Sequence, residues 1–274
     1  MICNQSCKNK GNVIADACTF FRILGYLRNK ASIYTNSQEV RNFIYENLKN
    51  ILKLIAECSI DDKILVEDSI YNDQINILNA SSRLANNQEI FGYYNHHGMI
   101  QEIADIFSRI IKVERIIEQE LEEFKSQFSA DRSDYIKHVG SHDLRLLILA
   151  VKQSAHAVII SQDSNLRAAA RELFSKNIVQ IQTINYKTDH ISSKPLEDFL
   201  SEPYSRCKIE HAEYQAMTLG LIAEMANSLA NGNRPASMAI LQSVVDFSGK
   251  EIQDAYIEKE SNRGRLICPS GLTI

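Results

Sequence analysis

Three aspartates occupy places in the sequence where their carboxylates could act together. Asp16 closes the apolar run "NVIAD", and Asp163 follows the apolar run "AVIIS". Asp143 lies in the first turn of the helical pattern "SHDLRLLILAVKQSA". Ligands of open parallel sheets bind outside the carboxyl ends of the strands. We therefore expect the three carboxylates to meet at one edge of a sheet.

Clustered carboxylates repel one another and raise each other's pKa values. A divalent cation relieves this repulsion, and a set of oxygen ligands favours Mg²⁺ or Mn²⁺ over zinc. Each acid also has a structural alternative, because Asp143 and Asp163 stand where helices begin and aspartate is a common helix cap. The set of three favours a metal site.

The surrounding elements alternate between strand and helix patterns, which predicts an α/β fold with a parallel sheet of about four to five strands flanked by helices. Residues 64–66 form a second strand pattern, followed by Glu67, Asp68 and Asp73. Long amphipathic helices are predicted at about 37–58 and 99–128. A loop or broken helix is predicted at 80–97, where Tyr93, Tyr94, His96 and His97 form a cluster. Such side chains could stack on bases or bind a metal, but a structural role in the loop is the simpler expectation.

Composition changes after residue 184. We predict that residues 11–184 form one domain, that 185–206 form a polar linker, and that 207–274 form a helical C-terminal extension with helices at about 208–230 and 235–262. Apolar stripes on these two helices predict packing on the core, contact with a protein inhibitor, or a homo-oligomer interface.

The 274 residues carry a net charge of −4, which argues against a general basic coat for nucleic acid. The six cysteines include no C-x-x-C pair, and dispersed free thiols are expected. The first residues are polar, and no segment approaches the roughly 18 consecutive apolar residues of a membrane span. These features predict a cytoplasmic protein without a membrane partner.

Three segments resemble motifs of the PIN-domain nucleases. "VIADACTFFRIL" resembles the first strand, acid and helix, and "KILVEDSIYNDQI" resembles the second strand and the helix that carries the second acid. "HDLRLLILAVKQSAHAVIISQDSNL" resembles an Asp-led helix, a strand and a Ser/Thr-x-Asp signature. The resemblance covers about residues 11–184, and its strength lies in the order and spacing of the three motifs.

The resemblance implies a metal-dependent endonuclease that hydrolyses phosphodiester bonds, mostly in single-stranded RNA, with Mg²⁺ or Mn²⁺. It assigns catalytic and metal-binding roles to Asp16, Asp143 and Asp163, and a supporting role to Ser161. Asp73 stands where the family usually has Glu, so Glu67 and Asp68 remain alternatives for the second acid. A toxin or phage-defence effector would fit this activity.

Substrate phosphates would require cationic side chains. The candidates near the acids are Lys137, His138, His142, Arg145 and Arg167. A surface charge is the simpler interpretation of any one of them. Two further functions stay open. One is a catalytically degenerate PIN-like scaffold or RNA-binding subunit. The other is a receiver-like or phosphatase-like domain, although such domains normally have a pair of acids near the first strand and this sequence offers one.

Overall fold

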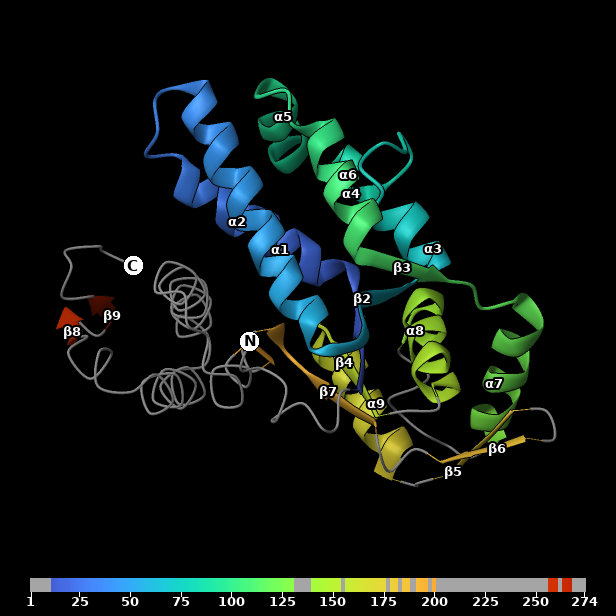
Figure 1. The fold of residues 1–274 in the computed structure, drawn as a ribbon. Coiled ribbons are helices and arrows are strands. Elements are labelled where there is room, and N and C mark those ends of the chain that lie inside the picture. The colour runs from blue at the N-terminus through green and yellow to red at the C-terminus, as the bar shows by residue number, and fades with distance from the viewer. Residues whose placement is uncertain are drawn as a thin grey trace. The chain divides into compact units, whose positions relative to one another are not determined.

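A five-stranded, all-parallel sheet forms the centre of the fold (Figure 1), as expected. The computed structural model describes residues 11–130, 139–153, 156–175, 178–181, 184–187, 191–196, 199–200, 256–260 and 263–267. The chain divides into two units, residues 9–195 and residues 1–8 with 196–274. The sheet and its flanking helices belong to the first unit, so the predicted α/β class is confirmed and agrees with a PIN-like fold.

The strand order places β1 at the middle of the sheet. The order is β3-β2-β1-β4-β7, with bounds Ile111–Glu114, Ser59–Glu67, Gly11–Ala15, Ala157–Ile160 and Ile191–Lys194. The inner strands β1 and β4 are almost continuously buried and apolar, as is typical of parallel strands covered on both faces. Their register pairs Ala15 with Ile160, so the residues that follow both strands emerge side by side.

The chain changes direction across the sheet between β1 and β4. From β1 it proceeds outward to β2 and β3, and from β4 it proceeds to β7 on the other side. The point between β1 and β4 is therefore a topological switch point, where open α/β sheets bind their ligands at the carboxyl edge. Asp16 follows β1 directly, and Ser161 follows β4 directly.

Helices flank the sheet. They are α1 (Ala17–Ala31), α2 (Ser37–Glu57), α3 (Asp68–Ile70), the π-helix η1 (Tyr71–Ile75), α4 (Arg83–Asn86), α5 (Gln88–His96), α6 (Ile100–Ile110), α7 (Glu118–Ala130), α8 (Ser141–Lys152) and α9 (Ser164–Ser175). Helix α1 contacts α2, and α2 contacts α6 and β2, which forms a long helical layer (Figure 1). Helix α8 contacts β2 and β4, and α9 contacts β7.

The helix predicted at 37–58 is confirmed as α2, whereas the single helix predicted at 99–128 is wrong. That segment contains α6, the strand β3 and the start of α7. The sequence Ile111-Lys-Val-Glu alternates apolar and polar side chains, and it pairs with β2 in parallel from Ile64 to Glu67. Backbone pairing with β2 makes this segment a strand. The sequence alone did not predict it, because the residues on both sides follow a helical pattern.

The predicted linker at 185–206 is wrong where it covers β7, which is the fifth strand of the central sheet, and where it covers residues 185–187, which belong to the strand β6. The strand predicted after α9 is present as β5 (Ile178–Ile181), but it pairs antiparallel with β6 (Ile184–Lys187) in a separate two-stranded sheet. β7 escapes prediction because its sequence, ISSK, is polar and its residues are mostly half-buried.

The second unit contains an antiparallel pair, β8 (Tyr256–Glu260) and β9 (Arg263–Ile267). The helix predicted at about 235–262 is therefore wrong at its C-terminal end, where residues 256–260 form the strand β8. The other residues of the two predicted C-terminal helices lie outside the described part of the chain. Within the described residues, no helix has the length and apolar character that crossing a membrane requires.

Candidate functional site

Asp16 occupies the switch point of the sheet with its side chain 7% exposed. It is the N-cap of α1, and its Oδ1 accepts a 2.6 Å hydrogen bond from the Ala17 backbone N–H. Its Oδ2 accepts hydrogen bonds of 2.8 Å from both Ser161 Oγ and Cys18 Sγ. A carboxylate has about four acceptor positions, so a fourth partner can still bind. The hydrogen bonds thus fix the orientation of the buried carboxylate and leave one of its acceptor positions open.

Cys18 is a site residue that the sequence analysis missed. Besides donating to Asp16, its sulfur accepts a 3.0 Å hydrogen bond from the Gln162 backbone N–H and lies 3.5 Å from Ser161 Oγ. Burial, followed by the charge and hydrogen bond of Asp16, raises the pKa of the thiol from 9.0 to about 12. The available signal was its position two residues after Asp16, in the first turn of α1.

Ser161 joins the acid of β1 to the acid that follows β4. Its fully buried hydroxyl donates to Asp16 and accepts a 3.0 Å hydrogen bond from the Asp163 backbone N–H. Asp163 is exposed, and its Oδ1 caps α9 by accepting from the backbone N–H groups of Asn165 and Leu166 at 2.7 and 3.3 Å. The role predicted for Ser161 agrees with this geometry.

Asp143 lies within the electrostatic influence of the other two acids. Burial, followed by the charges of Asp16 and Asp163, raises its pKa from 3.8 to about 6, although a hydrogen bond from the Gly140 backbone opposes this shift. Helix α8 begins after Gly140, which offers no side-chain cap, and Asp143 is in its first turn. Asp16 and Asp163 are therefore near enough to Asp143 for their charges to act on its carboxyl group.

Glu67 has a different position from these acids. It is 1% exposed, caps α3 through the backbone N–H groups of Ser69 and Ile70, and accepts a 3.4 Å hydrogen bond from Ile116 N–H. Arg145 Nη1 lies 3.9 Å from Glu67 Oε1, and the same guanidinium contacts Ile116 O and Glu118. Glu67 and Arg145 thus connect β2, α8 and the segment after β3.

Asp73 projects from the π-helix η1, and its side chain is 61% exposed. Its Oδ2 lies 4.0 Å from Nε2 of the half-exposed His142. The other ring nitrogen of His142, Nδ1, lies 3.0 Å from Ser69 Oγ. Asp68, the remaining alternative for the second acid, accepts a 2.9 Å hydrogen bond from Asn72 Nδ2. Of the three alternatives, Asp73 is the acid that lies beside His142, which directly precedes Asp143 in the sequence.

The donor chemistry of the acids fits a hard divalent cation. Asp16, Asp143 and Asp163 offer oxygen ligands only, which Mg²⁺ and Mn²⁺ accept. Among the residues with described positions, no three His, Cys, Asp or Glu side chains are grouped closely enough to hold a metal ion by themselves. Mg²⁺ commonly binds through one or two carboxylates and completes its shell with water and substrate phosphates. The acids fit that mode of binding.

The residues predicted to bind phosphate make different contacts in the structure. Arg167 Nη1 donates a 2.8 Å hydrogen bond to the Ser161 carbonyl oxygen, so it supports the turn after β4. His142 borders Asp73, whereas Arg145 is held by Glu67 and Glu118. Lys137 and His138 lie outside the described residues.

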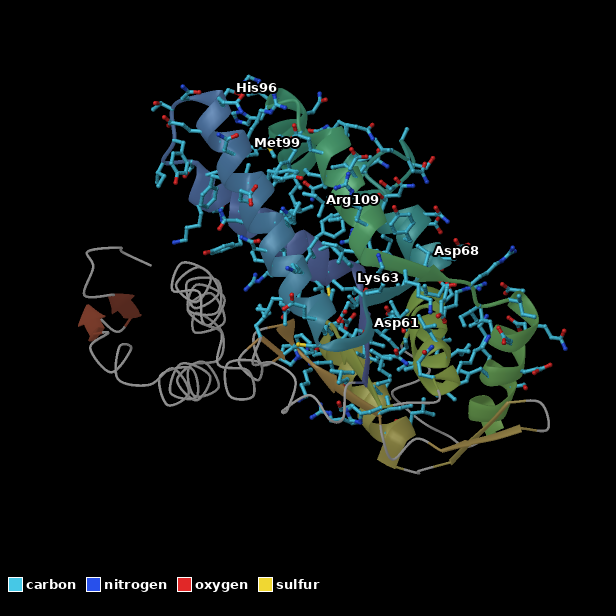
Figure 2. All side chains as sticks on the ribbon, viewed as in Figure 1. Asp61, Lys63, Asp68, His96, Met99 and Arg109 are labelled. Atoms are coloured by element: carbon cyan, nitrogen blue, oxygen red, sulfur yellow. The ribbon has the colours of Figure 1, made fainter. Side chains whose placement is uncertain are left out.

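Tyr93, Tyr94 and His96 are on α5 rather than in a loop, and His97 is the C-cap of this helix. Tyr94 is fully buried and donates a 2.7 Å hydrogen bond to Leu24 O, and His97 Nδ1 lies 3.1 Å from Ser37 Oγ. Figure 2 shows His96 at the end of the helical layer remote from Asp68, which follows β2. The cluster therefore does not belong to the carboxyl edge of the sheet.

Comparisons with protein-family models, with curated proteins and with solved structures found no match to this chain.

Proposed function

We propose that this chain is a metal-dependent endonuclease that hydrolyses phosphodiester bonds, with single-stranded RNA as the preferred substrate. The observation that carries the proposal is the buried Asp16 carboxylate at the switch point between β1 and β4, which Ser161 Oγ joins to the backbone of Asp163, with Asp143 under the influence of both acids. Their mutual effect is expressed in the pKa of Asp143, which the charges of Asp16 and Asp163 help to raise. The resemblance of the three sequence motifs to PIN-domain nucleases gives independent support.

Asp16, Asp143 and Asp163 would hold Mg²⁺ or Mn²⁺, with Asp73 as a further acid. The bound cation would supply Lewis-acid stabilisation of the phosphate and a more acidic water. Ser161 and Cys18 would orient the Asp16 carboxylate by donating to its Oδ2. Because Ala17 N–H donates to Oδ1, one acceptor position of that oxygen is left for a ligand. Arg167 would keep the Ser161 backbone in place through the Ser161 carbonyl oxygen.

The decisive experiment is a cleavage assay on labelled single-stranded RNA and single-stranded DNA with Mg²⁺, Mn²⁺ or EDTA. We expect cleavage of RNA by the wild type in either metal, none in EDTA, and a loss of at least about 100-fold in Asp143→Asn. Asp105→Asn is the matched control, because Asp105 is an exposed acid on α6. Cleavage that persists both in EDTA and in Asp143→Asn contradicts the proposal.

A catalytically degenerate scaffold or RNA-binding subunit is the second candidate. It is favoured by the use of these acids as helix caps, since Asp16 caps α1 and Asp163 caps α9 through hydrogen bonds to backbone N–H groups. This function predicts RNA binding of equal affinity in Mg²⁺ and EDTA, without cleavage. Filter binding with the same RNA, run beside the cleavage assay, separates the two functions.

We further propose a cytoplasmic toxin or phage-defence effector that associates with a protein inhibitor or with itself through residues 207–274. The apolar stripes of the two predicted helices in this segment support the proposal. Light scattering of the full chain over a concentration series tests self-association. A monomeric mass at all concentrations contradicts the homo-oligomer and leaves the inhibitor version to be tested by binding.

A further inference from the structure

The Ser69 hydroxyl lies between a buried carboxylate and an imidazole. Ser69 Oγ donates a hydrogen bond to Glu67 Oε2 and lies 3.0 Å from His142 Nδ1. Glu67 also accepts from the backbone of Ser69, Ile70 and Ile116 and pairs with Arg145, so its two oxygens serve as acceptors. The proton of the Ser69 hydroxyl is therefore directed to Glu67.

This arrangement fixes the tautomer of His142. A serine hydroxyl has one proton, and a neutral imidazole carries hydrogen on one of its two nitrogens. Because the Ser69 proton is directed to Glu67, the hydroxyl must accept from His142, and Nδ1 must carry the hydrogen. In the neutral ring, Nε2 is then left with a lone pair.

A second acceptor lies near Nε2 of His142. Asp73 Oδ2 is 4.0 Å away, which is too long for a direct hydrogen bond. A nitrogen and a carboxylate oxygen at this separation can both bind one cation. Histidines that bind metals almost always donate their other ring N–H to a carboxylate, a carbonyl or another polar group, as His142 does through Ser69. Asp73 also projects from a π-helix, a feature that is frequent at functional sites.

We propose that His142 Nε2 and Asp73 Oδ2 together bind a divalent cation, and that the imidazole nitrogen makes this position selective for a transition metal such as Mn²⁺ over Mg²⁺. Mg²⁺ takes oxygen ligands, whereas first-row transition metals also accept imidazole. The pair accounts for an Asp where PIN-domain nucleases usually have Glu, because the histidine supplies a ligand beside the shorter side chain. The inference rests on the proposed nuclease function, since Asp73 is the further acid of that proposal.

Mn²⁺ binding to the full chain, followed by electron paramagnetic resonance, tests the pair directly. Pulsed spectra of the wild type with one equivalent of Mn²⁺ should show coupling to a ¹⁴N nucleus. His142→Gln should lose that coupling and bind Mn²⁺ about 10-fold or more weakly, with Mg²⁺ affinity in calorimetry little changed. His96→Gln is the matched control, because His96 is an exposed histidine on α5, and it should retain both coupling and affinity.

Ser69→Ala tests the tautomer argument, because it removes the group that holds hydrogen on Nδ1. We expect Mn²⁺ affinity about 10-fold lower with the ¹⁴N coupling retained. The inference is overturned if the wild type shows no ¹⁴N coupling or if the coupling survives in His142→Gln. Metal-dependent RNA cleavage without ¹⁴N coupling would refute this pair and leave the nuclease standing, whereas ¹⁴N coupling without cleavage would refute the nuclease and leave the metal pair standing.

Discussion

Ser161 Oγ donates a 2.8 Å hydrogen bond to Asp16 Oδ2, although the two residues lie 145 positions apart in the sequence. The contact joins the ends of β1 and β4, which the register already places side by side. Both side chains are buried, and the same hydroxyl accepts from Asp163 N–H. One hydroxyl therefore sets the direction of one acid and the backbone position of another.

Ser161→Ala should destabilise the fold by about 1–3 kcal/mol, because it removes one donor to the buried Asp16 carboxylate and leaves the Asp163 N–H without its acceptor. Urea unfolding followed by circular dichroism measures the change. Ser164→Ala is the control, since Ser164 is an exposed serine three residues along the chain, and it should stay within about 0.5 kcal/mol of the wild type. Equal stability of the two variants would contradict the role given to Ser161.

Asp143 predicts a pH dependence of stability. Its pKa is about 6 in the folded protein against an ordinary value of 3.8, so between roughly pH 4 and 6 the folded state binds a proton that the unfolded state has lost. Stability therefore falls as pH rises through this window, and the loss persists above pH 6. Asp143→Asn lacks this titration, so in EDTA it should gain stability relative to the wild type as pH rises from 4 to 7.

Urea unfolding of both proteins at pH 4, 5, 6 and 7 in EDTA measures that gain. Asp105→Asn should show no comparable trend, because Asp105 is exposed on α6 and apart from the acid cluster. A difference between Asp143→Asn and the wild type that does not change with pH would show that the pKa of Asp143 is not raised, either by burial or by the charges of Asp16 and Asp163.

The carboxyl edge of the sheet was predictable because its signals are local. An apolar run that ends in an acid predicts both the strand and the location of Asp16 or Asp163, and the parallel order brings the two together. Asp143 was predictable for the same reason, since an apolar helix pattern begins beside it. These arguments depend on a few residues on either side of each acid.

The remaining elements of the site depend on contacts that sequence patterns do not express. β3 and β7 occupy the two outer positions of the sheet, and their short sequences contain polar residues, so pairing with β2 and β4 defines them. Glu67 was an alternative for the second acid, and its tertiary contacts with Ile116 and Arg145 could not be read from the sequence. The place of Cys18 in the site depends on a contact that is distant in the sequence, because its sulfur accepts a hydrogen bond from Gln162 N–H in the turn after β4.

Glu67 and Asp73 should respond to neutralisation in different ways. Glu67→Gln weakens the charge-assisted contacts of a buried carboxylate with Ser69, Ile116 and Arg145, so we expect a loss of about 1–3 kcal/mol in unfolding free energy. Asp73→Asn removes a charge from an exposed side chain and should change stability by less than about 0.5 kcal/mol, while it weakens Mn²⁺ binding. Asp73→Asn thus serves as the matched control for Glu67→Gln.

Urea unfolding and Mn²⁺ titration of the two variants decide which acid belongs to the site. If Glu67→Gln keeps wild-type stability and loses Mn²⁺ binding, Glu67 rather than Asp73 is the second acid. The exposure of the two side chains, 1% for Glu67 and 61% for Asp73, favours Asp73 as the second acid.

Cys18 predicts a thiol that is inert in the folded protein. With a pKa of about 12, on the order of one thiol in 10⁴ is ionised at pH 8, and the thiolate is the species that alkylating reagents attack. Iodoacetamide labelling, read for each cysteine by peptide mass spectrometry, should modify Cys18 much more slowly in the native protein than in urea. Asp16→Asn should accelerate native labelling, because the charge of Asp16 and its hydrogen bond both raise the pKa of Cys18. Asp105→Asn should not change the rate, and rapid labelling of Cys18 in the native wild type would contradict its placement against Asp16.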